Sequence, residues 1–383
     1  MKILFFSPYF YPYTSGITTY PQKIFNHLAK KNQIKILTFR YDEKLKKTEK
    51  FDGCQIIRMD YWFKISKGFL SPQSLIPFFK EAKKADLILL NIPNSEGLPL
   101  AILAKILRRP FISIFHCQVF LEKSFFNRVV NCFLNFSIFV QLLLSNNIIA
   151  YTKDYFKSLD ISRFFLKKTR FILPPVDLLK INQKKLNDLV NLKRNKIWIG
   201  YAGRIASEKG LEYLIQSLTP AGWSNGLPAG EIELVFAGPY GKDVAGENKY
   251  FQKIITLLKE NKIKYRFFGN LSGGDLSAFY KTIDILTLPS INQTEAFGMV
   301  QVEAMLLGTP AIASNLPGVR VPIRLTKMGI LVEPKNSQQI SEAIIKILKN
   351  KNKFSNEFLI NKAKKIFNIK KTYHFYDKTI NLY

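Results

Sequence analysis

Short apolar runs alternate with segments of helical periodicity along the whole 383-residue chain, and this alternation constrains the fold more than any other feature. Parallel α/β units produce it, because each buried strand is followed by a helix that carries the chain back to the next strand. The first series of predicted strands comprises Lys2–Ser7, Ile34–Phe39, Ile56–Met59, Leu87–Asn91, Phe111–Phe115 and Ile148–Tyr151. The second comprises Ile197–Ala202, Leu234–Ala237, Tyr265–Phe268, Ile285–Leu288, Ala311–Ala313 and Ile330–Val332.

Two such series predict two Rossmann-like, doubly wound domains that face a central cleft, with ligands bound at the carboxyl ends of the strands. We expect an N-terminal domain at 1–180, a polar and basic linker at 181–196, and a C-terminal domain at 197–366. A basic, aromatic tail at 367–383 is expected to pack back on the first domain. Predicted helices include Thr18–Lys31, Leu211–Leu218, Tyr250–Glu260, Val300–Leu307, Ser337–Lys349 and Phe354–Phe367.

The net charge of +29, from 57 Lys and Arg against 28 Asp and Glu, suggests a polyanionic partner. Nucleic acid, an anionic membrane face or phosphorylated substrates would all fit. The larger surplus lies in residues 1–175, and a lysine-rich genome could also produce it. The few cysteines and histidines lack the spacing of a disulfide framework or a metal site, so we expect no metal and no cofactor; they are Cys54, Cys117, Cys132, His27, His116 and His374.

One segment invites a membrane interpretation, because no charged residue lies between Arg128 and Lys153. Its polar residues fall within one arc of roughly 120° at helical periodicity, which indicates an amphipathic helix of about 18 residues and then a strand. A spanning helix needs about 20 mostly apolar residues. The first apolar run is too short for a secretion signal, so we expect a cytoplasmic protein.

The strongest local motif is Gly203-Arg204-Ile205-Ala206-Ser207-Glu208-Lys209-Gly210, between a predicted strand and a predicted helix. Its glycines would let the backbone approach a ligand. Arg204 and Lys209 lie beside a helix N-terminus, where free amides and the helix dipole favour an anion such as a phosphate group. The same sequence pattern would also fit a solvent-exposed turn whose charged residues bind no ligand.

The second motif is Glu295-Ala296-Phe297-Gly298-Met299-Val300-Gln301-Val302-Glu303, where a loop opens into a helix. The amides from Phe297 to Val300 can face an anion, while Glu295 and Glu303 can accept hydrogen bonds from hydroxyl groups. Amides for phosphates and carboxylates for ribose and sugar hydroxyls suit a sugar nucleotide. The alternative is that Glu295 only complements the helix dipole and Glu303 is a solvated helix residue.

Together these motifs resemble glycosyltransferase family 4, the retaining transferases of GT-B fold, over nearly the whole chain. Weaker pieces follow in the family's order; they are Ser15-Gly16, Phe115-His116-Cys117, Phe236-Ala237-Gly238-Pro239, Phe268-Gly269-Asn270, Leu288-Pro289-Ser290, Gly308-Thr309-Pro310 and Leu316-Pro317-Gly318. The chain departs from the family pattern at Ser15, where a second glycine is usual, and at Cys117, where an acid is frequent.

The resemblance implies a role for each residue. Arg204 and Lys209 would stabilise the departing diphosphate, Glu303 would hold the ribose, and Glu295 would hold the transferred sugar. His116 would face that sugar from the first domain. The remaining residues would bind the donor through their backbone; they are Gly16, Gly203, Gly238, Phe297, Gly298, Met299 and Val300.

The resemblance implies a retaining glycosyltransferase that uses a nucleoside-diphosphate sugar, and with Arg204 and Lys209 at the diphosphate we expect it to need no metal. The chain contains no Asp-x-Asp, Gly-x-Gly-x-x-Gly or complete P-loop motif. Because the more basic half is the acceptor half, we expect a lipid-linked or membrane-proximal glycan acceptor and a peripheral position on an anionic membrane face, not a nucleic-acid partner. The alternatives are a soluble acceptor, or a non-catalytic Rossmann pair that binds membranes or nucleic acid.

Overall fold

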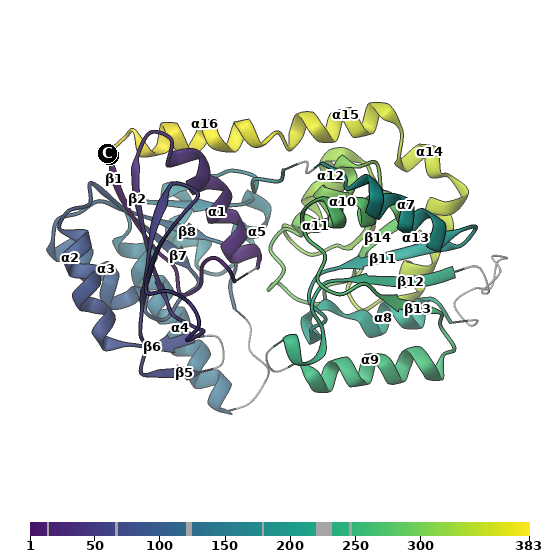
Figure 1. Cartoon of the computed structure of the whole chain (residues 1–383), viewed down its shortest axis with the longest axis horizontal. Coiled ribbons are helices and arrows are strands. Elements are labelled where there is room, and N and C mark those ends of the chain that lie inside the picture. The colour runs from purple at the N-terminus through teal and green to yellow at the C-terminus, as the bar shows by residue number, and fades with distance from the viewer. Residues whose placement is uncertain (14, 66–67, 120–124, 178–179, 220–231, 245–246) are drawn as a thin grey trace. The chain divides into compact units, whose positions relative to one another are not determined.

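A computed structural model describes residues 1–13, 15–65, 68–119, 125–177, 180–219, 232–244 and 247–383 (Figure 1). The chain divides into two compact units. Unit 1 comprises Met1–Pro175 and Ile369–Tyr383, and unit 2 comprises Val176–Asn368. The chain thus leaves unit 1 once and returns to it with its last helix.

Unit 1 is built on an eight-stranded sheet of order β10-β9-β8-β7-β1-β2-β4-β3, in which only the β3–β4 pair is antiparallel. The strands are β1 Lys2–Phe6, β2 Gln33–Phe39, β3 Thr48–Phe51, β4 Cys54–Met59, β7 Leu87–Ile92, β8 Phe111–Phe115, β9 Asn147–Ala150 and β10 Thr169–Phe171. A separate hairpin pairs β5 Phe63–Ile65 with β6 Gly68–Leu70.

Helices cover both faces of this sheet because its strands are apolar on both sides. The side chains of Leu4 and Phe6 pack in one core with α2 and α3, whereas Phe5 lies on the opposite face against Phe25 of α1, with ring centroids 4.5 Å apart. The helices of unit 1 are α1 Gly16–Leu28, α2 Leu75–Ala82, α3 Gly97–Ile106, α4 Phe125–Leu144, α5 Lys153–Lys157, α6 Ser162–Phe165 and α16 Ile369–Ile380. Figure 1 shows α16 beside α1, which it contacts.

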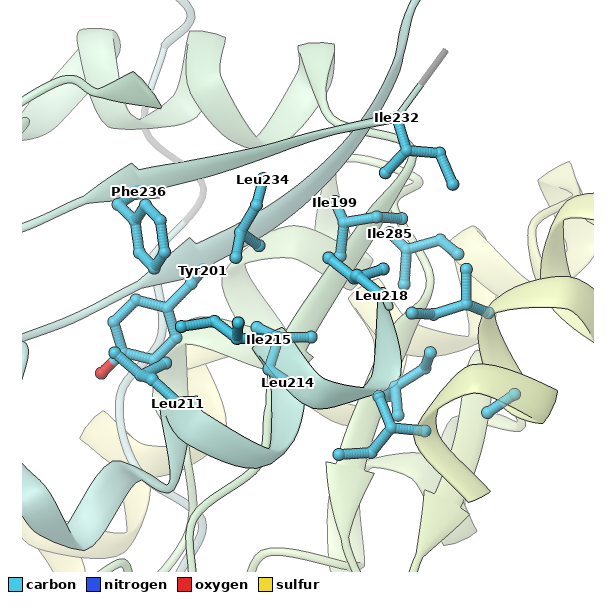
Figure 2. Close-up of a cluster of buried hydrophobic side chains, with 14 of the residues drawn as sticks. Ile199, Tyr201, Leu211, Leu214, Ile215, Leu218, Ile232, Leu234, Phe236 and Ile285 are labelled. Atoms are coloured by element: carbon cyan, nitrogen blue, oxygen red, sulfur yellow. The ribbon is translucent and has the colours of Figure 1, made fainter. Parts of the chain in front are cut away.

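Unit 2 is built on a six-stranded, all-parallel sheet of order β13-β12-β11-β14-β15-β16. Helix α8 packs on one face of the sheet; in Figure 2, Leu214 and Ile215 point toward side chains of β11 and β12 such as Leu234. The strands are β11 Ile197–Ala202, β12 Ile232–Ala237, β13 Tyr265–Phe267, β14 Ile285–Leu288, β15 Ala311–Ser314 and β16 Gly329–Val332. The helices are α7 Gln183–Lys193, α8 Leu211–Ser217, α9 Asn248–Glu260, α10 Gly273–Thr282, α11 Met299–Leu306, α12 Val321–Thr326, α13 Ser337–Lys349, α14 Lys351–Phe354 and α15 Glu357–Ile366.

The structure differs from the sequence-based expectation between the two domains. The segment 181–196, expected to be a linker, contains helix α7, which packs on α10 and belongs to unit 2. The apolar residues Leu186, Leu189 and Val190 have helical spacing, but only Leu189 is buried, and the many basic residues of the segment favoured the linker interpretation. The segment expected to be amphipathic forms α4. Among the described residues, no helix combines the length and the apolar composition needed to cross a bilayer.

Candidate functional site

The candidate site of unit 2 lies where the strand order of its sheet reverses. Crossovers run outward from β11 to β13 on one side and from β14 to β16 on the other. At such a switch point the loops after the two central strands separate and form a crevice that binds ligands. The loop after β11 carries Arg204 and Lys209, and the loop after β14 carries Glu295.

Two of the predicted glycines let adjacent loops approach closely. The N–H of Gly203 donates to the carbonyl oxygen of Ala237 at 2.8 Å. A Cβ on Gly238, whose φ is +138°, would lie 2.2 Å from the carbonyl oxygen of Gly203. The carboxyl ends of β11 and β12 are therefore in backbone contact, and a side chain at Gly238 would separate them.

Each of the two predicted cations of this site forms an ion pair with a carboxylate. Arg204 donates from Nη2 to Glu208 Oε1 at 2.9 Å, within the turn that contains the 3₁₀ segment Ser207–Lys209. Lys209 donates from Nζ to Glu295 Oε2 at 2.7 Å. The second ion pair joins the loop after β11 to the loop after β14, so the structure brings Lys209 and Glu295 together as direct partners. Both side chains are less than one fifth exposed.

Glu295 is held as a carboxylate by its surroundings. Burial by itself would raise its pKa, but Lys209 and the backbone N–H groups of Gly298 and Phe297 outweigh burial and bring the pKa below its ordinary value of 4.5. The Gly298 N–H donates to Oε1 at 2.9 Å. Near neutral pH this side chain therefore presents two oxygens that accept hydrogen bonds, one toward Lys209 and one toward the start of α11.

The start of α11 is fixed by a buried glutamine that the sequence analysis did not single out. Gly298 precedes α11 in the left-handed conformation, with a φ of +76°. Gln301 is fully buried and donates from Nε2 to the carbonyl oxygens of Phe297 and Val319, both at 2.9 Å. The predicted donor-binding backbone 297–300 thus lies at the N-terminus of α11. The side chain of Gln301 holds the carbonyl group of Phe297 in place from the buried side of the helix.

Glu303 lies about one turn along α11, where Tyr280 of α10 contacts it. The Tyr280 hydroxyl donates to Glu303 Oε2 at 2.8 Å. Burial and the nearby Glu303 raise the pKa of Tyr280 well above its ordinary range, so the phenol keeps its proton and acts as a donor. This contact orients the carboxylate through one oxygen.

In unit 1, the structure places His116 at the end of β8 in a buried network. Its Nε2 is bonded to Asn91 Oδ1 and its Nδ1 to the hydroxyl of Tyr151. Asn91 donates from Nδ2 to the carbonyl oxygen of Ile17 at 3.2 Å, so its Oδ1 is the acceptor. Nε2 therefore carries the ring proton, and Tyr151 donates to Nδ1.

Burial lowers the pKa of His116 to about 3, so the ring is neutral near neutral pH. The network also reaches the first loop of unit 1, because Asn91 Nδ2 donates to Ser7 Oγ at 3.0 Å. Gly16 is exposed at the first position of α1, one residue before Ile17. The network thus brings His116 and the segment that follows Gly16 together, whereas a contact of either residue with a ligand stays a prediction.

Sequence reasoning missed several partners that shape the site. Glu208 had a usable signal, because it lies four residues after Arg204. Tyr280, Asn91 and Tyr151 had none, because their pairings join different elements of the fold; the bond from Gln301 to Phe297 is local, but its bond to Val319 is not. Among the described residues, no group of three or more His, Cys, Asp and Glu side chains could share a metal ion.

The region that carries the unit 2 site also matches a known family. Residues 182–366 match the family model described as glycosyl transferases group 1. This part of the chain, just under half of its length, is similar to that family. Its group 1 match includes both motif loops, the strands before them and α11.

Curated relatives by sequence carry compatible names. An uncharacterized glycosyltransferase of Methanocaldococcus jannaschii is 29% identical over 176 residues, which are 46% of this chain and 41% of the relative. The lipopolysaccharide 1,2-N-acetylglucosaminetransferase of Salmonella typhimurium is 30% identical over 171 residues, 44% of each protein. The matched region thus spans less than half of the length of these relatives.

Comparison with solved structures shows the fold of the whole chain. HepE of Anabaena in complex with UDP matches with a TM-score of 0.77 and 19% identity, over the full length of both chains. The fold is therefore the GT-B architecture, with two Rossmann-like α/β domains, as the sequence predicted.

Proposed function

We propose that this protein transfers a sugar from a nucleoside-diphosphate sugar to a hydroxyl group of an acceptor, with retention of anomeric configuration and without a metal ion. The observation that carries the proposal is the Lys209–Glu295 pair beside the N-terminus of α11, at the switch point of unit 2. It joins a phosphate-binding cation, a hydroxyl-binding carboxylate and helix amides in one place. The group 1 match of the same residues supports it.

The diphosphate of the donor would bind to Arg204, Lys209 and the amides at the start of α11. Negative charge grows on this group as the bond to the sugar breaks, so donors fixed in advance lower the barrier. Because Lys209 and Arg204 already hold carboxylates, they would be shared between these partners and the phosphates. The positions of both cations are therefore set before the donor arrives.

The two carboxylates would orient the rest of the donor. Glu303, fixed through Oε2 by Tyr280, would accept ribose hydroxyls through its other oxygen. Glu295 would accept hydroxyl groups of the transferred sugar. In the step itself, the acceptor oxygen bonds to the anomeric carbon on the face from which the diphosphate leaves. The acceptor proton passes to an oxygen of the departing diphosphate.

We propose a lipid-linked or membrane-proximal glycan as the acceptor. The basic surplus of residues 1–175 and the lipopolysaccharide transferase among the relatives support this choice. Other relatives are named D-inositol 3-phosphate glycosyltransferases, so a soluble acceptor is the second candidate. A non-catalytic Rossmann pair is disfavoured, because Arg204, Lys209, Glu295 and Glu303 are all present in the candidate site.

A panel of UDP-, GDP- and ADP-sugars, with and without EDTA, tests the donor class. We expect at least one donor to raise the melting temperature and to be hydrolysed slowly, because water can replace the acceptor. EDTA should leave both signals unchanged. If no nucleotide sugar gives either signal, the transferase proposal fails; if EDTA abolishes hydrolysis, the metal-independent mechanism fails.

The variants Arg204→Ala and Lys209→Ala test the site assignment. Each should lower donor hydrolysis by roughly 10²–10³-fold, as the loss of one preorganised donor does in other enzymes. Lys253→Ala is a matched control, because Lys253 pairs with Glu212 on the surface of the same unit. Near-normal turnover in both site variants would show that the assignment is wrong.

A further inference from the structure

Helix α4 of unit 1 carries its apolar side on the outside. Five of its large apolar side chains are more than half exposed; they are Phe125, Val129, Phe133, Phe136 and Leu143. At 100° per residue these positions span an arc of about 80°, so they form one continuous stripe along a helix of 20 residues. Contiguous exposed apolar surface of this kind marks a binding face.

The polar side of α4 faces the protein. Gln141 is fully buried and donates from Nε2 to the carbonyl oxygen of Asn94 at 3.2 Å. Ser137 is also fully buried and donates to the carbonyl oxygen of Ser95 at 3.3 Å. The usual orientation of a surface helix, apolar side inward and polar side outward, is therefore largely inverted. Such a helix is suited to an apolar environment on its outer side.

A neighbouring helix extends the stripe. Phe139 of α4 packs edge-on against Phe164 of α6, with ring centroids 5.5 Å apart, and more than half of the Phe164 side chain is exposed. The guanidinium of Arg163 lies 4.8 Å from the centre of the Phe164 ring. We name the five exposed apolar residues of α4, together with Phe164, the α4 stripe. The positively charged side chain of Arg163 lies at its border.

The border of the α4 stripe is basic. Arg128 is the only charged residue in α4, and Lys168 donates from Nζ to the carbonyl oxygen of Leu143 at 2.9 Å at the other end of the helix. Burial, together with the nearby Lys105 of α3, lowers the pKa of Lys168, so two cations lie close together there. The segment after α4, residues 145–170, contains six basic residues and only two acidic ones, Asp154 and Asp160.

We infer that the α4 stripe inserts into an anionic lipid surface, with α4 lying along the surface and the basic border against lipid headgroups. An apolar stripe bordered by cations fits the interfacial region of a bilayer, where apolar contact and attraction to anionic lipids act together. A second copy of the chain fits less well, because a two-fold interface would bring the basic borders together. The inference names a surface for the proposed acceptor class but does not depend on catalysis.

Sedimentation with lipid vesicles tests the inference on the full chain. We expect binding to vesicles of phosphatidylcholine and phosphatidylglycerol that weakens, but persists in part, at high salt. The double variant Phe133→Ser/Phe136→Ser should bind roughly tenfold more weakly or worse, because two phenyl rings no longer enter the bilayer. Phe358→Ser is the matched control, because Phe358 is a highly exposed phenylalanine on α15 of unit 2 and should leave binding unchanged.

The charged border is tested separately with Arg128→Gln and Arg163→Gln. Each should weaken binding to the anionic vesicles about fivefold and leave binding to phosphatidylcholine vesicles unchanged. Equal binding of the wild type and of the phenylalanine double variant would overturn the inference. So would a lack of binding by the wild type at low salt.

Two further measurements separate the inference from its competitors. If α4 were a contact between copies, the wild type would sediment as a dimer without lipid, and the double variant would be monomeric with unchanged vesicle binding; that result would overturn the inference. The phenylalanine variants should keep wild-type rates of donor hydrolysis. Hydrolysis absent from every form, with vesicle binding intact, would count against the proposed transferase alone.

Discussion

At the residue scale, the candidate site combines predictable residue types with unpredictable pairings. The motif around Arg204 and Lys209 indicates an anion site because cations beside a helix N-terminus favour phosphate. The sequence does not indicate that Lys209 and Glu295, 86 residues apart, are 2.7 Å from each other. Their pairing depends on β11 and β14 being neighbours in the sheet, which is a property of the fold. The local charge of the ligand-free site is thus lower than its cations alone suggest.

His116 provides a prediction at the same scale. Its pKa of about 3 lies below the ordinary value of 6.5, so between these pH values the unfolded chain binds a proton that the folded chain does not. Its contribution to stability is therefore complete above about pH 6.5 and falls as the pH decreases toward 3. When the pH is lowered from 7 to 5, the unfolding free energy of the wild type should decrease. In His116→Gln this decrease should be about 2 kcal/mol smaller.

Denaturant unfolding of the full chain at both pH values provides the measurement. His374→Gln is the control, because it also removes one imidazole, but from an exposed position outside the buried network of His116. An unchanged pH dependence in His116→Gln would contradict the buried, neutral assignment of this ring.

At the element scale, the predicted strands are all present because each is apolar and most are buried on both faces, as strands of parallel sheets are. The bounds differ by a few residues at most; the strand expected at Leu234–Ala237 runs over Ile232–Ala237. The hairpin of β5 and β6 and the edge strands β3 and β10 were not predicted, because short and partly exposed strands lack a clear apolar pattern. Helix α7 was missed because the basic residues of its segment obscured the helical spacing of Leu186, Leu189 and Val190.

The contact between the loops after β11 and β12 gives a prediction for these elements. Gly238→Ala places a Cβ against the carbonyl oxygen of Gly203, a backbone atom that cannot rotate away, at a φ that already disfavours alanine. We expect unit 2 to lose about 3 kcal/mol or more of unfolding free energy. Gly273→Ala, at a positive φ but with nothing within 4 Å, should cost only about 1–2 kcal/mol. Similar losses in both variants, measured by urea unfolding, would refute the close approach.

At the scale of the whole molecule, the sequence predicts two doubly wound domains and a tail at 367–383 that packs back on the first, but it does not indicate the contacts that hold this tail. The chain returns to unit 1 through α16, which packs against α1. Tyr376 of α16 and Tyr20 of α1 join their hydroxyls at 2.8 Å, and both side chains are fully buried. The next residue, Asp377, lies 3.0 Å from His27 of α1. These pairs join residues about 350 positions apart, so no local pattern could reveal them.

The buried pair leads to a prediction about how unit 1 is held together. Tyr376→Phe leaves the Tyr20 hydroxyl without its partner in a buried position, which should cost about 1–3 kcal/mol of unfolding free energy. Tyr383→Phe removes a tyrosine hydroxyl from the same end of the chain, but its bond to Asn147 is at the surface, so the cost should stay within about 0.5 kcal/mol. Urea midpoints of the two variants, compared at equal denaturant slopes, measure the difference. If Tyr376→Phe were as stable as Tyr383→Phe, the tyrosine pair would not anchor α16, and its apolar contacts with unit 1 would have to hold the helix instead.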